Sequence, residues 1–134
     1  MKIKIFALTH KKFEVPQDKM YQPLQVGREE KEDLGYLCDN TGDNISAENC
    51  YYSELTGLYW IWKNVHTYKY VGTCHYRRYL LNEQEKIFTE AEYLELLKDY
   101  DLITTKRVVL NNSYHYGFAT NHNIHALDMT GEVI

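Results

Sequence analysis

An imidazole and two guanidinium groups lie close together in this sequence, at His75, Arg77 and Arg78. They directly follow residues 69–74, whose composition predicts a buried strand. Open α/β sheets bind their ligands at the carboxyl ends of strands. Two neighbouring arginines suit a doubly charged anion, because each planar fork can bind phosphate oxygens bidentately. The motif therefore indicates a phosphate or diphosphate site. The alternative is that the arginines are surface charges paired with acidic residues.

Polar residues also follow the first predicted strand, residues 3–8, at Thr9 and His10. Because the carboxyl ends of parallel strands open on one edge of a sheet, we expect these two residues, Asp43 and residues 75–79 to converge on one concavity. If the strand stays extended through the motif, His75, Arg77 and Tyr79 share one face and Arg78 points to the other.

A long helix is predicted over residues 47–65, with Ser46 as its N-cap. Its apolar stripe has helical spacing and should face the core, whereas Trp60 lies on the opposite face. The stripe consists of Tyr51, Leu55, Leu58, Trp62 and Val65. Glu54 falls at the edge of this stripe, where a carboxylate is costly unless paired. We therefore expect Glu54 to be substantially buried and to form a structural ion pair with Arg77, Arg78 or His75.

The remaining segments predict an alternation of strands and helices. Residues 13–45 contain prolines, glycines and only a short strand at 24–26, with one helical turn at 28–33. A strand at 69–75 follows the long helix, and Thr89 and Glu92 form a capping box for a second helix. The buried face of that helix should comprise Ala91, Tyr93, Leu94 and Leu97. A third strand at 101–105, a polar turn at 111–117 and a helix at 122–129 complete the prediction. The fold class is α/β, an open and mostly parallel sheet with flanking helices, as in nucleotide-binding folds of the Rossmann type.

Composition limits the function classes. A chain of 134 residues with 44% hydrophobic content suffices for a single α/β domain, residues 1–134. A net charge of −4 and a pI near 5.8 argue against nucleic acid as a partner. No apolar run approaches the roughly 20 residues that cross a bilayer, and no signal pattern opens the chain, which indicates a cytoplasmic protein. Three cysteines without paired spacing predict neither disulfides nor a zinc site.

Five segments of the sequence together resemble one family. They are residues 7–11 (ALTHK), 23–27 (PLQVG), 39–46 (DNTGDNIS), 54–64 (ELTGLYWIWKN) and 71–79 (VGTCHYRRY). In this order they resemble a bacterial family of glycosyltransferase-like proteins encoded in capsular and exopolysaccharide gene clusters. That family is usually described as a domain of unknown function with an assumed activity of the GT-A type.

The resemblance implies a nucleotide-diphosphate sugar as donor and a saccharide or lipid-linked saccharide as acceptor, the latter placing the protein at the inner face of the membrane. We expect the substrate-binding residues to be Thr9, His10, Asp43, Asn44, His75, Arg77, Arg78 and Tyr79, with no catalytic residue assigned. We assign no residues of the sequence to the Asp-x-Asp motif by which GT-A enzymes hold a metal. Asp39 and Asp43 are the candidate ligands for Mg²⁺ or Mn²⁺, and Asp43 can equally cap a turn. Alternatively, Arg77 and His75 supply the positive charge that a metal would bring.

Members of the family are about twice as long, so the chain corresponds to their N-terminal, nucleotide-sugar-binding half. We therefore expect little transferase activity from it alone, and an apolar surface that a second copy or the other half of a longer domain covers. Two other function classes stay open. One is a non-catalytic nucleotide- or saccharide-binding relative, and the other is a phosphate-handling enzyme of another type, against which the absence of a P-loop pattern counts.

Overall fold

The computed structural model describes every residue except 112, 122, 124, 127–128 and 130–134. The chain forms two compact units, Met1–Ile103 and Thr104–Ile134. The first unit contains a four-stranded sheet whose paired strands are all parallel. Its strands are β1 (Ile3–Thr9), β2 (Tyr21–Gln25), β3 (Leu37–Cys38) and β4 (Tyr70–His75), in the order β3-β2-β1-β4. This confirms the predicted open parallel sheet, with β1 in the interior of the sheet.

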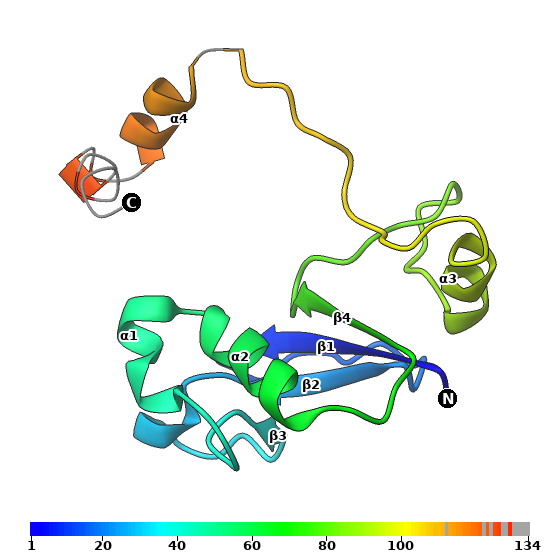
Figure 1. Ribbon diagram of the computed structural model, residues 1–134, viewed down its shortest axis with the longest axis horizontal. Coiled ribbons are helices and arrows are strands. Elements are labelled where there is room, and N and C mark those ends of the chain that lie inside the picture. The colour runs from blue at the N-terminus through cyan, green and yellow to red at the C-terminus, as the bar shows by residue number, and fades with distance from the viewer. Residues whose placement is uncertain (112, 122, 124, 127–128, 130–134) are drawn as a thin grey trace. The chain divides into compact units, whose positions relative to one another are not determined.

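The two faces of the sheet carry different helices (Figure 1). On β1, Phe6 and Leu8 pack in a cluster with Trp60 and Ile61 of α2 (Leu55–Asn64). The alternate side chains of β1 pack instead against Tyr93 of α3 (Glu90–Leu96). Because neighbouring strand residues point to opposite faces, β1 contributes to both cores.

The long helix predicted over residues 47–65 is wrong, because the chain breaks at Ser53. A 3-10 turn η2 (Ser46–Glu48), a one-turn helix α1 (Asn49–Tyr52) and then α2 occupy this segment. Ser53 has φ 50 and ψ −128, values incompatible with a continuous helix. Ser46 is not an N-cap either, since its hydroxyl donates a hydrogen bond to Asp39 Oδ1 at 2.6 Å.

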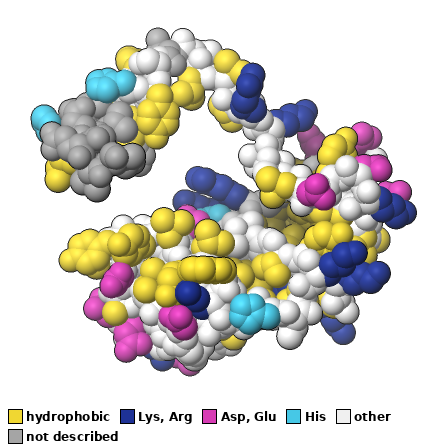
Figure 2. Space-filling model, viewed as in Figure 1, with side chains coloured by type: hydrophobic (Ala, Val, Ile, Leu, Met, Phe, Trp, Pro, Cys, Tyr) yellow, Lys and Arg dark blue, Asp and Glu magenta, His cyan; other side chains and the backbone are white. Residues whose placement is uncertain are grey.

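Four of the five stripe residues face solvent, which reverses the predicted orientation, whereas Val65 packs partly against the core. Tyr51 and Trp62 are 83% and 65% exposed, and Leu55 and Leu58 are exposed as well. Trp60, expected on the outer face, is buried and donates its indole N–H to the Thr41 carbonyl at 3.0 Å. In Figure 2, apolar side chains gather over α1 and α2. An exposed apolar surface was predicted, but different residues form it.

The inward face of α2 is made of small residues instead. Thr56 and Gly57 are buried beside Trp60 and Ile61. A Cβ at Gly57 would lie 2.6 Å from Val26 Cγ1 and 2.9 Å from Leu8 Cδ2. Close contact between α2 and the sheet therefore requires glycine at this position.

We expect Gly57→Ala to destabilise the first unit. In a helix this change normally adds up to about 1 kcal/mol of stability. Here the overpacking penalty of about 1–3 kcal/mol should outweigh that gain. Urea unfolding measures the difference, and Gly72→Ala is the control, because its nearest contact would be an ordinary 3.4 Å to Ile5 Cγ1. Stabilisation by Gly57→Ala would contradict this packing.

The segments after α2 follow the prediction only in part. The Thr89–Glu92 capping box is present and begins α3. Tyr93 is buried and Leu94 and Leu97 pack partly against the same cluster, but Ala91 is exposed. Strand β4 is an edge strand with exposed positions rather than a buried one.

The second unit differs more from the prediction. Residues 101–110, which span the boundary between the two units, form no strand and are largely exposed. Helix α4 (Tyr114–Asn121) occupies part of the predicted turn, and the Ser113 hydroxyl accepts a hydrogen bond from the Tyr116 N–H at 3.1 Å, as an N-cap does. Half of the helix predicted at 122–129, namely residues 122, 124 and 127–128, lies outside the described residues. No helix among the described residues is long and apolar enough to cross a bilayer.

Candidate functional site

The strand order of the sheet reverses between β1 and β4. From β1 the chain adds β2 and β3 on one side, then returns through α1 and α2 to place β4 on the other side of β1. Open α/β sheets bind ligands outside the carboxyl ends of the strands at such a switch point. Residues 9–11 and 75–78 are the chain segments at this edge, which we call the switch edge.

Tyr76 is the centre of the switch edge, although sequence reasoning gave it no role. Its backbone N–H donates to the Leu8 carbonyl at 3.1 Å, which ties the end of β4 to β1. Its ring is buried and lies among both imidazoles and two cations of the edge. The contacts are His75 at 4.4 Å, His10 at 5.5 Å, Lys11 Nζ at 5.5 Å and Arg77 Cζ at 5.7 Å. Tyr76 thus gathers positively charged groups around one aromatic ring.

A tight turn directly after β4 presents the two arginines. The Arg78 N–H donates to the His75 carbonyl at 2.9 Å, so the chain turns instead of staying extended. The predicted face-sharing of His75, Arg77 and Tyr79 is therefore wrong. Arg77 and Arg78 are both exposed, and neither forms an ion pair with a carboxylate of the described residues. The reading of these arginines as surface ion pairs thus finds no support in the described part of the chain.

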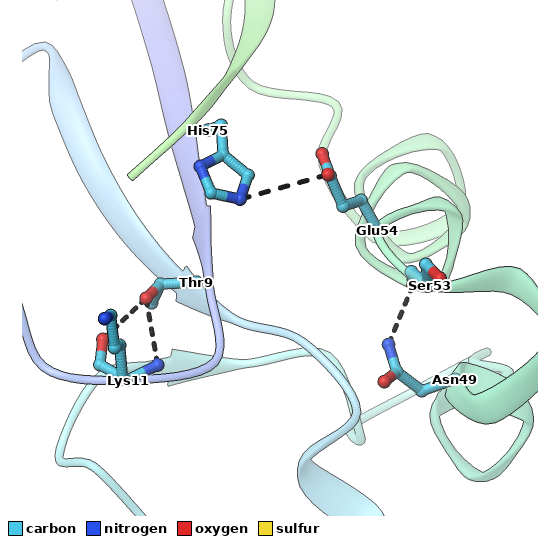
Figure 3. Close-up of polar contacts among 6 residues, drawn as sticks. All are labelled: Thr9, Lys11, Asn49, Ser53, Glu54 and His75. Carbon is cyan, nitrogen blue, oxygen red and sulfur yellow. Dashed lines mark hydrogen bonds and ion pairs between the residues drawn. The ribbon is translucent and has the colours of Figure 1, made fainter. Parts of the chain in front are cut away.

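His75 and Glu54 face each other across the switch edge (Figure 3). Nε2 of His75 lies 4.0 Å from Oε1 of Glu54, an ion-pair distance longer than a hydrogen bond. The Glu54 side chain is 57% exposed, so the expectation of a substantially buried carboxylate is wrong. The reason is that the apolar stripe beside Glu54 itself faces solvent, so a residue at its edge is exposed as well.

The surroundings of His75 disfavour its protonated form. Burial lowers the pKa of His75 below its ordinary value of 6.5, Glu54 opposes that effect, and Arg77, Arg78 and His10 lower the pKa further. Its Nδ1 is buried and has no hydrogen-bond partner among the described residues. His75 is therefore held mainly as the neutral imidazole at pH 7.

The hydroxyl groups of two predicted substrate-binding residues, Thr9 and Tyr79, form hydrogen bonds within the protein. The Thr9 hydroxyl is buried, donates to the Lys11 carbonyl at 2.5 Å and accepts from the Lys11 N–H at 3.1 Å, so it shapes the turn after β1. The Tyr79 hydroxyl donates to the Tyr76 carbonyl at 2.9 Å, and its ring packs against Tyr21. Burial raises the pKa of Tyr79 to about 12.

Asp43 and Asn44 lie along α2, away from the switch edge. Asp43 Oδ1 accepts from the Tyr59 hydroxyl at 3.0 Å, and its carbonyl accepts from Asn64 at 2.8 Å, near the end of α2 opposite to Glu54. Asn44 bonds to the backbone of Gly42 and Ser46. The structure therefore does not bring Asp43 into the concavity predicted with Thr9 and His10.

Asp39 is a fully buried carboxylate with a structural role. It accepts the Gly27 N–H at 2.8 Å, the Arg28 N–H at 3.1 Å, and the hydroxyls of Ser46 at 2.6 Å and Thr56 at 2.7 Å. These four donors fill the acceptor positions that a metal would need. No group of three His, Cys, Asp or Glu side chains in the described part of the chain is placed to hold a metal ion. Asp39 and Asp43 thus do not fit the predicted Mg²⁺ or Mn²⁺ site.

Comparison with known proteins identifies a family and one similar solved structure. A family model described as "Domain of unknown function (DUF4422)" matches residues 4–134. The chain belongs to this family. Curated proteins give no match. The apo structure of WbbM, a bifunctional glycosyltransferase, is similar with a TM-score of 0.56 and 42% identity over 60% of this chain. The match spans 14% of the WbbM chain, so this DUF4422 chain corresponds to a small part of that enzyme and is glycosyltransferase-like in fold.

Proposed function

We propose that this chain binds a nucleotide-diphosphate sugar at the switch edge and serves as the donor-binding part of a GT-A-type glycosyltransferase in capsular or exopolysaccharide biosynthesis. The observation that carries the proposal is the position of Arg77 and Arg78. Both guanidiniums are exposed and unpaired among the described residues, at the point where strand order reverses. Lys11 adds a positive charge from the turn after β1.

This arrangement suits a diphosphate leaving group, which is released when its sugar is transferred. Negative charge develops on the leaving diphosphate in the transition state of glycosyl transfer, and fixed cations stabilise it. Arginine forks bind its oxygens bidentately. The backbone hydrogen bonds of Tyr76 and Arg78 fix the turn that carries both arginines, so little ordering is needed when the ligand binds.

The proposal extends to the acceptor, where a saccharide or lipid-linked saccharide is the expected class, and to location in the cytoplasm at the inner face of the membrane. The family membership and the likeness to part of WbbM support glycosyl transfer in general.

A thermal unfolding screen tests the proposed function. Uridine, UDP, UDP-glucose, GDP and GDP-mannose are added with and without Mn²⁺. A diphosphate ligand at 100 times its Kd should stabilise the chain by about 2.7 kcal/mol. Uridine should stabilise it much less, because it lacks the phosphates that Arg77 and Arg78 bind. Equal stabilisation by uridine, or none by any diphosphate, would refute a diphosphate site.

A further inference from the structure

Glu54 places a negatively charged carboxylate beside the proposed anion site. Glu54 faces His75 at 4.0 Å, and His75 lies within the electrostatic reach of Arg77 and Arg78. A negative charge at this position opposes the binding of phosphate. If the switch edge bound only an anion, a neutral or basic residue at position 54 would serve better.

The backbone that places Glu54 is also unusual. Ser53 has φ 50 and ψ −128, a region that residues with a Cβ rarely occupy. Such conformations persist only where the surrounding structure enforces them, and they are frequent at functional sites. Residue 54 is the first after this break and precedes α2, so the break determines where its side chain projects.

A chain of polar contacts enforces the conformation of Ser53. Asn49 Nδ2 donates to the Ser53 carbonyl at 2.7 Å (Figure 3) and to Thr56 Oγ1 at 3.1 Å. The Thr56 hydroxyl in turn donates to the buried carboxylate of Asp39 at 2.7 Å. These hydrogen bonds link the backbone just before Glu54 to the buried Asp39, so the core of the domain fixes the position of Glu54.

We propose that Glu54 is the sugar-recognition residue of the switch edge, accepting a hydrogen bond from a hydroxyl of the donor hexose while Arg77 and Arg78 bind the diphosphate. The inference rests on the proposed function and adds a specificity residue to it. A carboxylate only accepts hydrogen bonds at neutral pH, and hydroxyls are the donors that a hexose offers. Glu54 is more than half exposed, so it has oxygen surface free for a ligand. Asn49 acts as its positioning residue through Ser53.

Titration calorimetry with UDP and UDP-glucose, or with GDP and GDP-mannose if the thermal screen selects guanosine, tests the inference. The wild-type chain should bind the sugar nucleotide more tightly than the nucleotide. Glu54→Ala should bind the nucleotide as tightly as wild type or more tightly, because a repulsive charge is gone. Its affinity for the sugar nucleotide should fall about tenfold or more, as expected for a lost hydrogen bond to a charged group.

Two further variants separate positioning from folding. Asn49→Ala should lower affinity for the sugar nucleotide and leave nucleotide affinity unchanged, whereas Ser53→Gly, which adopts positive φ without strain, should bind both as wild type does. Glu48→Gln removes an exposed acidic charge nearby and should change neither affinity. Thermal unfolding verifies that each variant is folded.

The outcomes distinguish this inference from the proposed function. If the wild-type chain binds both ligands equally, or if Glu54→Ala keeps the wild-type preference, the sugar-recognition role is refuted while diphosphate binding stands. If the wild-type chain binds neither ligand, both proposals fail.

Discussion

Replacing Asp39 with alanine should destabilise the first unit by about 3–5 kcal/mol, a large share of the 5–15 kcal/mol typical of a whole domain. The change strands four donors: the backbone N–H groups of Gly27 and Arg28 and the hydroxyls of Ser46 and Thr56. Each unpaired buried donor costs about 1–3 kcal/mol, offset in part where solvent enters.

Chemical denaturation followed by tryptophan fluorescence measures this loss, because Trp60 lies in the same unit. Asp43→Ala is the matched control, an aspartate four residues further along the chain whose side-chain bond to Tyr59 is exposed. It should cost under about 1 kcal/mol, as exposed polar contacts do. Equal losses for the two variants would show that Asp39 does not hold this unit together.

Removing both switch-edge arginines should abolish diphosphate binding at micromolar concentration. Each charge-assisted hydrogen bond to a phosphate oxygen contributes about 1.5–3 kcal/mol, so Arg77→Ala with Arg78→Ala should weaken UDP binding by about 100-fold or more. The single variants should each lose about tenfold or more on the same scale. Calorimetric titration of UDP, or of GDP if guanosine is preferred, gives the affinities.

The control for this experiment removes the same charge elsewhere. Lys86 and Lys98 are exposed, on the loop before α3 and just after α3 respectively. Their double alanine variant should bind the nucleotide within about threefold of wild type at physiological salt, where distant surface charges are screened. A similar loss of nucleotide affinity in both double variants would mean that net charge, and not a specific site at the switch edge, drives binding.

The sequence predicted the strands that carry the site, but not the conformation of the residues that follow them. Strand alternation and the position of the basic motif were sufficient to place β1 and β4 as parallel neighbours with charged residues at their ends. The turn at His75 was not predictable from alternation, because it depends on a backbone hydrogen bond to Arg78. The role of Tyr76 was not predicted for the same reason, although an aromatic residue between His75 and Arg77 could have indicated a cation–π contact.

The orientation of α2 was mispredicted for a definite physical reason. Hydrophobic periodicity assumes that the apolar stripe faces the core, but Leu58 and Trp62 are exposed. The inward face contains Thr56 and Gly57, which the pattern counts as neutral, and their small size is what permits close packing on the sheet. The role of Asp39 was likewise hidden, since its four donors lie 7 to 17 residues away along the chain.

The central claim, that a nucleotide diphosphate binds at the switch edge, is tested most directly by amide chemical-shift mapping of the isotopically labelled chain during titration with UDP or GDP. We expect the largest shifts at residues 9–11 and 75–78, with small shifts at residues 39–44. In the Arg77→Ala, Arg78→Ala double variant these shifts should disappear. Shifts centred on residues 39–44, or shifts that persist in the double variant, would contradict the placement of the site.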